Sequence, residues 1–487
     1  MNRQLKQVAV AILAMFGLLL INSNIVQVGQ ASSLRANPHN VRVLYGEYSH
    51  QRGPIVVAGQ SVAKSVKTHD SLKYLRTYPG GAEYAPVTGY YSLVYSSSGI
   101  EQAENSTLAG TSDQLFFHRI SDEITGRTPQ GGSVDLTINP DAQHAAYQGL
   151  ASAPSFNGVR AGAVVALNPQ TGAILAMASY PSYDPSQISG HNTKTDQAAF
   201  HQITHDPGDP LLNRAVNQSY PPGSTFKVIT SATALSSGKY TPSQPLIPAP
   251  SKLTFNNTTH TLSNFQGETC PGSGQITLAE ALKVSCNTAF GGLGLKLGSD
   301  AIAKQAAAFG FGKHLTIPIG VSDSNYVKTS DPPLLADSAI GQYSDSVTPL
   351  QMAMVAAGIA NHGIVMKPYL VADTKAPDAS VLTRARPQAF SQAVSPGVAS
   401  QLTTMMEGVT QPGGTGTAAA ISGIPVAAKT GTAENVPGQP THAWFIAFAP
   451  ATHPTVAVAV LVEHGGVGGV AAAPIAHTVM CAVLSCP

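Results

Sequence analysis

Tyr-Pro-Pro-Gly-Ser-Thr-Phe-Lys, residues 220–227, is the stretch around which the rest of the chain is organised. Its prolines and glycine cannot continue a helix, whereas residues 226–235 form an apolar run typical of one, ending near Gly238. Ser224 is therefore predicted to lie at a helix N-terminus, with Lys227 one turn later on the same face. Residues three apart on a helix have Cβ atoms roughly 5–6 Å apart, so the lysine amine can reach the serine hydroxyl.

This pair is a candidate nucleophile and base. A serine hydroxyl is a poor nucleophile until a neighbour takes its proton. A lysine can take it only when burial, nearby cations and the positive end of a helix lower its pKa toward neutrality. The Ser-x-x-Lys spacing alone is not specific, because it recurs at 61–64 and 236–239, where a solvated helix face explains it.

The overall composition narrows the class of protein. The 487 residues are enough for two or three domains. A net charge of +1 argues against nucleic acid or an anionic surface as the main partner. Charged residues make up 11% of the chain, against a typical value of about 25%, which is compatible with an extracytoplasmic protein.

The N-terminal segment predicts export. Arg3 and Lys6 precede an apolar run over residues 8–21, which continues as a mixed segment to Val28. A membrane span needs about 20 residues and a cleavable signal core about 7–15, so both remain open, and residues 29–31 offer a small-x-small cleavage site. In either case the basic flank places the N-terminus in the cytoplasm and the chain beyond the segment outside.

Four cysteines, Cys270, Cys286, Cys481 and Cys486, fit an oxidising compartment. They allow three pairings, and our hypothesis is the sequence-local one, Cys270 with Cys286 and Cys481 with Cys486. Closing a loop of about 15 residues is worth roughly 3 kcal/mol in the chain-entropy treatment. No Cys-x-x-Cys pair and no clustering of the 15 histidines indicates a metal, and we expect neither a metal nor a cofactor.

Residues 32–154 predict a small, mostly β domain. Short alternating runs at 41–45, 90–94 and 133–138 are typical of strands. No constellation in this region carries chemistry, which indicates a spacer or an interaction module.

Residues 155–487 predict an α+β domain. Apolar runs over 162–167 and 173–179 flank a turn and form a hairpin. Adjacent strands with short connections imply an antiparallel sheet, and the neighbouring helices should cover both of its faces. Further strands are expected at 426–432, 442–448 and 455–463, and helices at 277–282, 298–310, 348–362 and 396–409.

Three short motifs stand in order along this domain. They are Ser-x-x-Lys at 224–227, Ser-x-Asn at 285–287 and Lys-Thr-Gly at 429–431, the last on a predicted strand. Each alone has decoys, such as Ser-Phe-Asn at 155–157. The three together in this order are much more specific than any one of them.

In this order the motifs resemble the active-site set of serine β-lactamases and penicillin-binding proteins. Over almost its whole length the chain resembles a class B penicillin-binding protein of the actinobacterial penicillin-binding protein A group. Residues 155–487 are similar to its transpeptidase domain, and Arg-Gly-Pro-Ile at 52–55 with Gly-Ile-Glu at 99–101 resembles its N-terminal pedestal. The Asp-Arg-Asn-Gly that usually follows Arg-Gly-x-Ile is absent, which leaves the role of residues 32–154 open. The resemblance favours an uncleaved single-pass anchor at 1–31.

The resemblance implies the roles of the catalytic residues. Ser224 attacks the carbonyl of the penultimate D-Ala of a peptidoglycan stem and forms an acyl-enzyme, and Lys227 is its base. Ser285 relays a proton toward the leaving amine, while Asn287 binds Lys227 and the substrate amide. Lys429 helps to keep Lys227 neutral by like-charge repulsion.

The third motif is implied to bind the substrate. Lys429, Thr430 and Thr432 hold the terminal carboxylate, because a cation and two hydroxyls suit an anion, and Gly431 lies among them. The oxyanion hole uses the backbone N–H groups of Ser224 and Thr432. One such donor is worth roughly 3–4 kcal/mol in other enzymes.

The implied activity is that of a D,D-transpeptidase that cross-links peptidoglycan stems ending in D-Ala-D-Ala and is inhibited covalently by β-lactam antibiotics. Proteins of cell division or elongation, among them a glycan polymerase, are the implied partners. A D,D-carboxypeptidase or endopeptidase would carry the same motifs. A β-lactam receptor would need several spans or a cytoplasmic effector domain, and only about seven residues precede the apolar run. A β-lactamase would need a base for the deacylating water, and no acidic residue is clearly placed for that role.

Two further residues, one inside the second motif and one after the third, have both a structural and a catalytic interpretation. Cys286 occupies the middle of Ser-x-Asn, where a disulfide to Cys270 would pin the motif against the preceding loop. As a nucleophile Cys286 would need an activating partner, and none is evident. Glu434 follows the third motif and is expected at the mouth of the cleft, outside the catalytic set.

Overall fold

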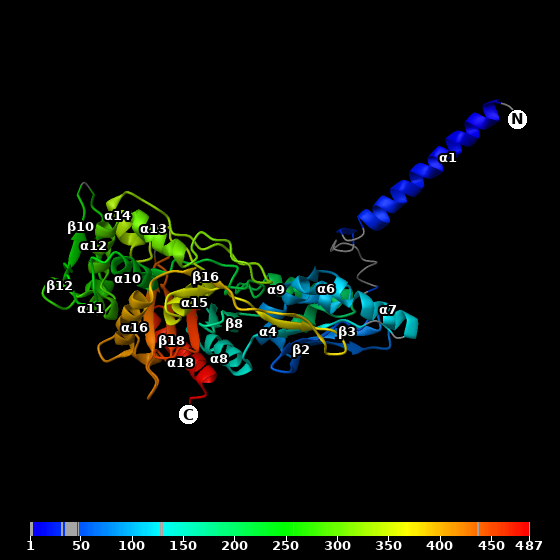
Figure 1. The fold of residues 1–487 in the computed structure, drawn as a ribbon. Helices are drawn as coiled ribbons and strands as arrows, with labels where there is room; N and C mark the ends of the chain where they lie inside the picture. Colours follow the sequence, from blue (N-terminus) through cyan, green and yellow to red (C-terminus); the bar gives the residue numbers. More distant parts are fainter. Residues whose placement is uncertain are drawn as a thin grey trace.

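The computed structural model describes residues 3–30, 33–34, 46, 48–126, 128, 130–256, 258–435 and 438–486. Its N-terminal helix, α1 (Arg3–Asn24), continues through a π-helical turn, Ile25–Gly29, and stands apart from the rest of the molecule (Figure 1). With a mean hydropathy of 2.2 and no buried residue, this segment is long and apolar enough to cross a membrane. The strand expected at 41–45 lies outside the described residues.

The region predicted at 155–487, called the second region here, is built on an antiparallel sheet with the strand order β17-β18-β19-β7-β8. Four of its strands are almost continuous apolar runs because helices cover both faces, whereas β17 carries the Lys-Thr-Gly motif. The predicted hairpin and the three predicted C-terminal strands are confirmed. The strands are β7 (Gly162–Leu167), β8 (Ile174–Tyr180), β17 (Ala427–Ala433), β18 (His442–Ala449) and β19 (Val456–Val462).

Alternate side chains of β19 enter two separate hydrophobic cores. Ala459 belongs to the core that contains α15 (Pro349–Ala360), whereas Val460 belongs to the core that contains α8 (Pro140–Ala151) and α18 (Ala473–Leu484). The helix α15 is apolar all round and completely buried, as expected of a helix between a sheet and further helices.

Helices on the α15 side of the sheet carry the first two motifs. The five helices predicted in this region, at 226–235, 277–282, 298–310, 348–362 and 396–409, are confirmed, with ends that agree within a few residues. Three of them begin with a side-chain cap; in the last, for example, Ser395 Oγ accepts from the N–H of Val398, and proline occupies the first helical position. The helices are α10 (Lys227–Ser236), α11 (Leu278–Lys283), α12 (Asn287–Leu297), α13 (Ser299–Ala308), α14 (Pro332–Ser338) and α16 (Pro396–Thr410).

The N-terminal region is mixed α/β, with more helix than the sequence pattern indicated. The run at 90–94 forms only the two-residue strand β4 (Tyr91–Ser92), because short apolar runs do not distinguish strand from helix by periodicity. Helices take up most of residues 81–125. They are α4 (Gly81–Thr88), α5 (Gly99–Ala103), α6 (Asn105–Leu108) and α7 (Phe116–Thr125).

The sheet of the N-terminal region includes strands from the second region. Its order is β15-β14-β6-β1-β2-β3, and β14 pairs antiparallel with β6, so a segment near residue 373 completes a sheet begun near residue 55. These hydrogen bonds tie the two regions together. The strands are β1 (Ile55–Val57), β2 (Gln60–Lys67), β3 (Tyr74–Thr77), β6 (Ser133–Leu136), β14 (Val371–Lys375) and β15 (Val381–Arg384).

A buried charge cluster lies at the centre of the N-terminal region. Glu101 accepts the Nε–H of Arg52 and the Nε–H of Arg76, both at 2.6 Å, through its two carboxylate oxygens. Arg52 also donates to Asn105 Oδ1 at 2.6 Å, and Arg76 donates to Gly53 O at 2.8 Å. The Arg-Gly-x-Ile and Gly-Ile-Glu elements seen in the sequence therefore meet in one ion-pair network.

Candidate active site

Ser224 lies in a 3-10 turn, residues 223–226, that leads directly into α10. Gly223 enters the turn with a φ of +53°, a conformation that favours glycine, and its N–H donates to Gly341 O at 2.8 Å. The Trp444 indole N–H donates to Pro221 O at 2.9 Å. Ser224 is thus held at the start of a helix, as the sequence predicted.

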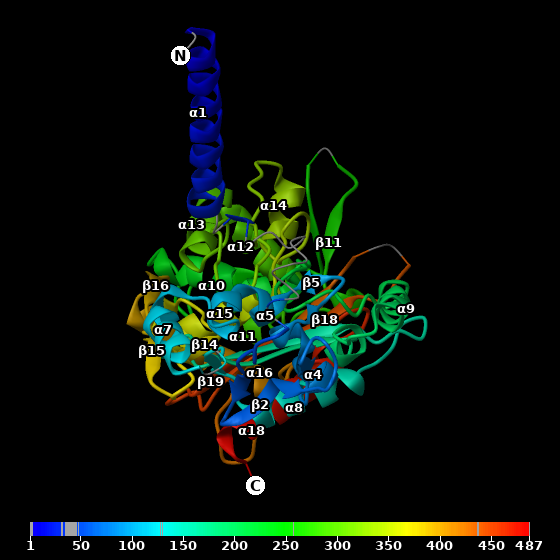
Figure 2. The same cartoon turned by 90° about the vertical axis from the view of Figure 1, so that its right-hand side faces the viewer.

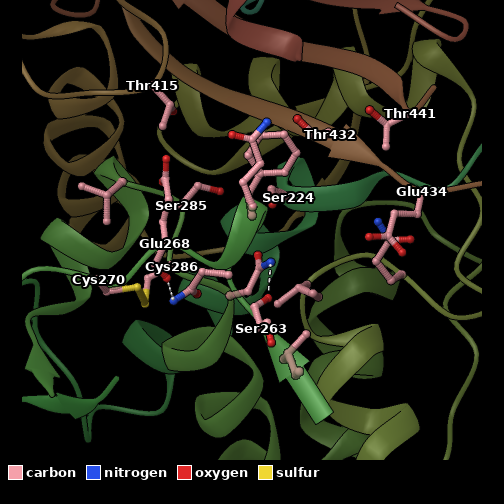
Figure 3. Close-up of a pocket in the computed structure, with 18 of the residues that line it drawn as sticks. Ser224, Ser263, Glu268, Cys270, Ser285, Cys286, Thr415, Thr432, Glu434 and Thr441 are labelled. Carbon is pink, nitrogen blue, oxygen red and sulfur yellow. Dashed lines mark hydrogen bonds between the residues drawn. A yellow bond between two sulfur atoms is a disulfide. The ribbon is translucent and has the colours of Figure 1, made fainter. Parts of the chain in front are cut away.

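The turn packs against the edge strand β17, which carries the third motif. A Cβ added at Gly431 would lie 2.7 Å from Trp444 Cβ and 2.9 Å from Thr225 Cγ2, closer than real Cβ contacts come. Glycine at this position therefore allows β17 to approach the turn that carries Ser224. The next residue, Thr432, lies beside Ser224 in the cleft (Figure 3).

Lys227 is fully buried and faces the second motif. Its Nζ donates to Ser285 O at 2.7 Å, to Asn287 Oδ1 at 2.6 Å and to Ser285 Oγ at 3.2 Å. The direct hydrogen bond from Lys227 to Ser224 that the spacing allows is not made within the described residues. Catalytic hydrogen bonds are often long before substrate binds, so this geometry keeps Lys227 a candidate base.

Lys429 reaches the same hydroxyl from β17. Its Nζ donates to Ser285 Oγ and to Thr430 O, both at 2.9 Å, and its side chain is also fully buried. Ser285 Oγ therefore lies within hydrogen-bond distance of both amines. A proton can pass between Lys429 and Lys227 through this one hydroxyl.

Both lysine pKa values are lowered. Burial, and then the charge of Lys429, hold the pKa of Lys227 well below 10.5. Burial lowers the pKa of Lys429 to about 7. A neutral amine keeps two N–H donors and gains a lone pair, so Lys227 can retain its two shortest hydrogen bonds and still accept a proton.

Ser285 is held in a strained conformation between α11 and α12. Its φ is +62°, which non-glycine residues adopt at a cost of about 1–3 kcal/mol and which is concentrated at functional sites. Asn264 Oδ1 accepts the Thr288 N–H at 3.1 Å, and a disulfide joins Cys286 to Cys270 in the loop before it. The disulfide at Cys286 and the hydrogen bond at Thr288 both tie the segment after Ser285 to the preceding loop and so hold Ser285 in place.

The three motifs open into one cleft of about 840 Å³. In Figure 3, Thr432 lies above Ser224, the Cys270–Cys286 disulfide lies on one side, and Glu434 and Thr441 lie on the other. Glu434 also lines the cleft.

The structure brings together all the predicted motif residues. Ser224, Ser285, Asn287, Thr430 and Thr432 line the cleft, Lys227 and Lys429 lie buried behind it, and Gly431 lies in the strand between Thr430 and Thr432. The other cysteine pair, Cys481 with Cys486, closes the end of α18 and is not part of the cleft lining. Within the described parts of the chain, no group of three or more His, Cys, Asp or Glu side chains could hold a metal ion.

Several cleft residues have no signal in the three motifs. Thr415 Oγ1 lies 2.7 Å from Thr430 Oγ1, and its only local signal is a glycine-rich loop after α16. Ser263 O accepts the Nδ2–H of Asn287 at 3.0 Å. Tyr343, with a φ of +66°, is 45% exposed and lines the cleft. Thr415 and Tyr343 lie in loops and Ser263 ends the strand β11 (Thr261–Ser263), and only the tertiary structure sets their positions around the cleft.

Comparison with known proteins agrees with this geometry. The family model described as the penicillin-binding protein transpeptidase domain matches residues 162–481, and that described as the penicillin-binding protein A dimerisation domain matches residues 52–134. The chain is 47% identical to the peptidoglycan D,D-transpeptidase PbpA of Mycolicibacterium smegmatis, over 99% of both chains. It is 45% identical to PbpA of Mycobacterium tuberculosis, again over 99% of both chains.

Solved structures of penicillin-binding protein A are also similar to this chain. The ceftriaxone acyl-enzyme complex of penicillin-binding protein A from M. tuberculosis has a TM-score of 0.87 and 43% sequence identity, and the match covers 90% of this chain and 100% of that one. The penicillin G acyl-enzyme complex of the same protein has a TM-score of 0.85, with the same identity and coverage.

Proposed function

The chain belongs to the class B penicillin-binding proteins, and we propose that Ser224 carries the acyl group in its reaction. The enzyme is a serine-type peptidoglycan D,D-transpeptidase of cell wall synthesis, and β-lactams are its covalent inhibitors. The observation that supports the assignment of residues is the single hydroxyl, Ser285 Oγ, within hydrogen-bond distance of two buried lysines with lowered pKa values, beside Ser224.

In the acylation step, neutral Lys227 takes the proton of Ser224 as Oγ attacks the carbonyl of the penultimate D-Ala. The C–N bond to the last D-Ala breaks, and the departing nitrogen receives a proton relayed through Ser285. Asn287 holds the Lys227 amine and the substrate amide. The acceptor amine of a second stem then attacks the ester carbonyl, forms the cross-link and releases the Ser224 hydroxyl.

Binding of the substrate carboxylate falls to the third motif. Lys429, Thr430 and Thr432 supply a cation and two hydroxyls, and Thr415 orients the Thr430 hydroxyl. The backbone N–H groups of Ser224 and Thr432 form the oxyanion hole, as the close approach of the turn to β17 allows. The Cys270–Cys286 disulfide fixes the loop beside Ser285 and does not take part in the chemistry.

We further propose a cell-membrane location with α1 as an uncleaved single span. Arg3 and Lys6 on its N-terminal side favour a cytoplasmic N-terminus and an extracytoplasmic active site. The proposed organisation is an anchor at 1–31, a pedestal at 32–154 and a transpeptidase domain at 155–487. The pedestal contacts proteins of division or elongation, including a glycan polymerase, and the name of the family model that matches 52–134 suggests self-association as an alternative role.

The test is intact-protein mass spectrometry of the full chain in detergent after incubation with benzylpenicillin, beside Ser224→Ala. We expect one long-lived penicilloyl adduct on the unmodified chain and none on the variant. Rapid loss of the adduct with drug hydrolysis would favour a β-lactamase, and an adduct retained by Ser224→Ala would refute the proposed nucleophile. An assay with a D-amino acid as acceptor separates transpeptidation, in which the acceptor is incorporated, from carboxypeptidation, in which D-Ala is only released.

A further inference from the structure

The helix α7 carries an apolar stripe on its outward face. Phe117 and Ile124 are each 80% exposed, and Phe116 and Ile120 are 48% and 38% exposed. At 100° per residue these four positions fall within an arc of about 100° on one side of the helix. Leu115, just before the helix, is instead buried in the N-terminal region.

We propose that this stripe, Phe116, Phe117, Ile120 and Ile124, lies in the outer surface of the lipid bilayer that the proposed anchor crosses. The inference rests on that anchor. Interfacial helices have apolar side chains on one face and polar ones on the other, and they lie with the apolar face in the headgroup and acyl boundary; the stripe of α7 faces outward, as such a contact requires. The ring pair of Phe116 and Phe117, with centroids 5.6 Å apart, forms the bulkiest part of the stripe.

The position of α7 supports a membrane contact. In Figure 1, α7 lies at the end of the molecule away from helices α10–α14 of the catalytic region. Figure 2, which faces this end, shows α7 near the surface of the molecule. Residues 30–47 connect the anchor to the body and fully extended reach at most about 60 Å, so the pedestal cannot move far from the bilayer.

The size of the stripe favours lipid over a second copy of the chain. Taking about 200 Å² for a fully exposed large side chain, the stripe exposes roughly 500 Å² of apolar surface. A stable protein–protein interface buries about 800 Å² per partner. A contact made by an already anchored chain is intramolecular and does not need such an area, because the tether supplies a high local concentration of membrane.

The contact would fix the orientation of the catalytic region. A single span leaves the extracytoplasmic part free to turn about the connecting segment, whereas a second contact point at α7 restricts this rotation. The cleft then stays at a set height above the bilayer. The stripe is thus a positioning device for reaching the polymer substrate and has no part in the chemistry.

The experiment places a fluorescent label at single introduced cysteines in the full chain. All four native cysteines are paired, so Phe117→Cys and Ile124→Cys can be labelled selectively with an environment-sensitive nitrobenzoxadiazole dye. The matched control is Ser121→Cys, which is exposed on the same helix outside the stripe. The labelled chains are placed, one per disc, in nanodiscs of phosphatidylglycerol and phosphatidylethanolamine, with and without nitroxide on the acyl chains.

We expect nitroxide lipid to quench the dye at 117 and 124 at least threefold more than at 121. Equal quenching at all three positions, with the chain still held in the disc, would overturn the lipid contact and leave the anchor intact. A blue shift at 117 and 124 only in discs with two chains, without lipid quenching, would overturn it in favour of a second copy.

Two controls separate the lipid contact from the proposed anchor and from an effect of α7 on the fold. The mass of the N-terminal peptide from purified membranes reports whether the anchor is retained, and a cleaved N-terminus would overturn both the anchor and the contact that rests on it. Phe117→Gln with Ile124→Gln should leave acylation by benzylpenicillin in detergent unchanged, since these residues lie outside the cleft. A loss of acylation would show instead that α7 supports the fold of the catalytic region.

Discussion

Two clusters of buried cations lie in different regions of the molecule and differ in what surrounds them. In the N-terminal region, Arg52 and Arg76 clasp the carboxylate of Glu101, and all three side chains are almost completely buried. In the catalytic region, Lys227 and Lys429 share only neutral acceptors, chiefly the hydroxyl of Ser285. The first cluster contains a buried anion, and among the described contacts of the second there is none.

This difference decides which cluster can do chemistry. Arginine stays protonated in proteins, and its planar fork suits a carboxylate, so the first cluster holds fixed charges that join β3, α5 and the segment before β1. Burial without an anion lowers the pKa of a lysine, so the second cluster is suited to the base that we propose. Burial of cations therefore holds structure together in one region and supports the proposed catalysis in the other.

The largest expected effect comes from removing the proposed base. Lys227→Met should lower the rate constant of acylation by benzylpenicillin by about 10²- to 10⁴-fold, the usual contribution of general base catalysis. The melting temperature should stay the same or rise, because a buried amine is replaced by an apolar chain of similar length. Stopped-flow acylation and differential scanning fluorimetry measure the two. An acylation rate within threefold of the original chain would show that another group takes the proton.

Glu101→Gln tests the stability that the charge cluster of the N-terminal region provides. It leaves two buried guanidinium groups without a counter-charge, and breaking a buried ion pair in this way costs about 3–5 kcal/mol. We expect that loss in the free energy of unfolding by urea titration, with little change in the acylation rate of the chain that remains folded. Asp300→Asn, which removes the negative charge from an exposed ion pair with Lys328, is the matched control and should cost less than about 1 kcal/mol. Equal effects of the two changes would mean that the Glu101 network adds no stability.

The dependence of stability on pH tests whether the buried lysines, unlike the buried arginines, lose their protons. Lys429 has a pKa of about 7 in the folded chain and an ordinary value near 10.5 when unfolded, so between these values the folded chain binds fewer protons. The free energy of unfolding should therefore rise with pH across this window, by up to about 1.4 kcal/mol per pH unit for this group. Lys227 contributes in the same direction, since its pKa is also lowered.

Melting temperatures at pH 7 and pH 9 check this expectation. Lys429→Met should reduce the rise between the two pH values, whereas Lys328→Met, at an exposed lysine, should leave it unchanged. An unaltered rise in Lys429→Met would mean that Lys429 is not deprotonated in this range.

The smallest effect concerns the choice between arginine and lysine. Arg52→Lys keeps a cation beside Glu101 but loses the fork that also reaches Asn105 Oδ1 and Glu101 O. We expect a loss of about 1–2 kcal/mol in the free energy of unfolding, less than for Glu101→Gln, because the carboxylate keeps a partner. Urea titration of both variants side by side gives the comparison, and a larger loss for Arg52→Lys would reverse the order that the ion-pair argument predicts.

Much of the fold could be predicted from the chain alone. Four of the five strands of the main sheet are apolar and bounded by turn residues, and the helices at 348–362 and 396–409 begin with proline at their first position, so their type follows from local pattern. The fold of the N-terminal region was harder to predict. Its runs are short, and two strands of its sheet come from residues more than 230 positions away, which no local pattern reports.

The sequence by itself determined the three motifs, the order in which they occur and the residue types that nucleophilic acyl transfer needs. Only the tertiary structure decided that Lys227 turns toward Ser285 and Asn287 while Lys429 reaches the same hydroxyl, and that Thr415 and Ser263 support them. Periodicity reports which face of a segment is buried but not which distant segments meet there. The pKa of a lysine depends on that meeting, because burial and neighbouring charges, set by the packing of several elements, determine whether the amine keeps its proton.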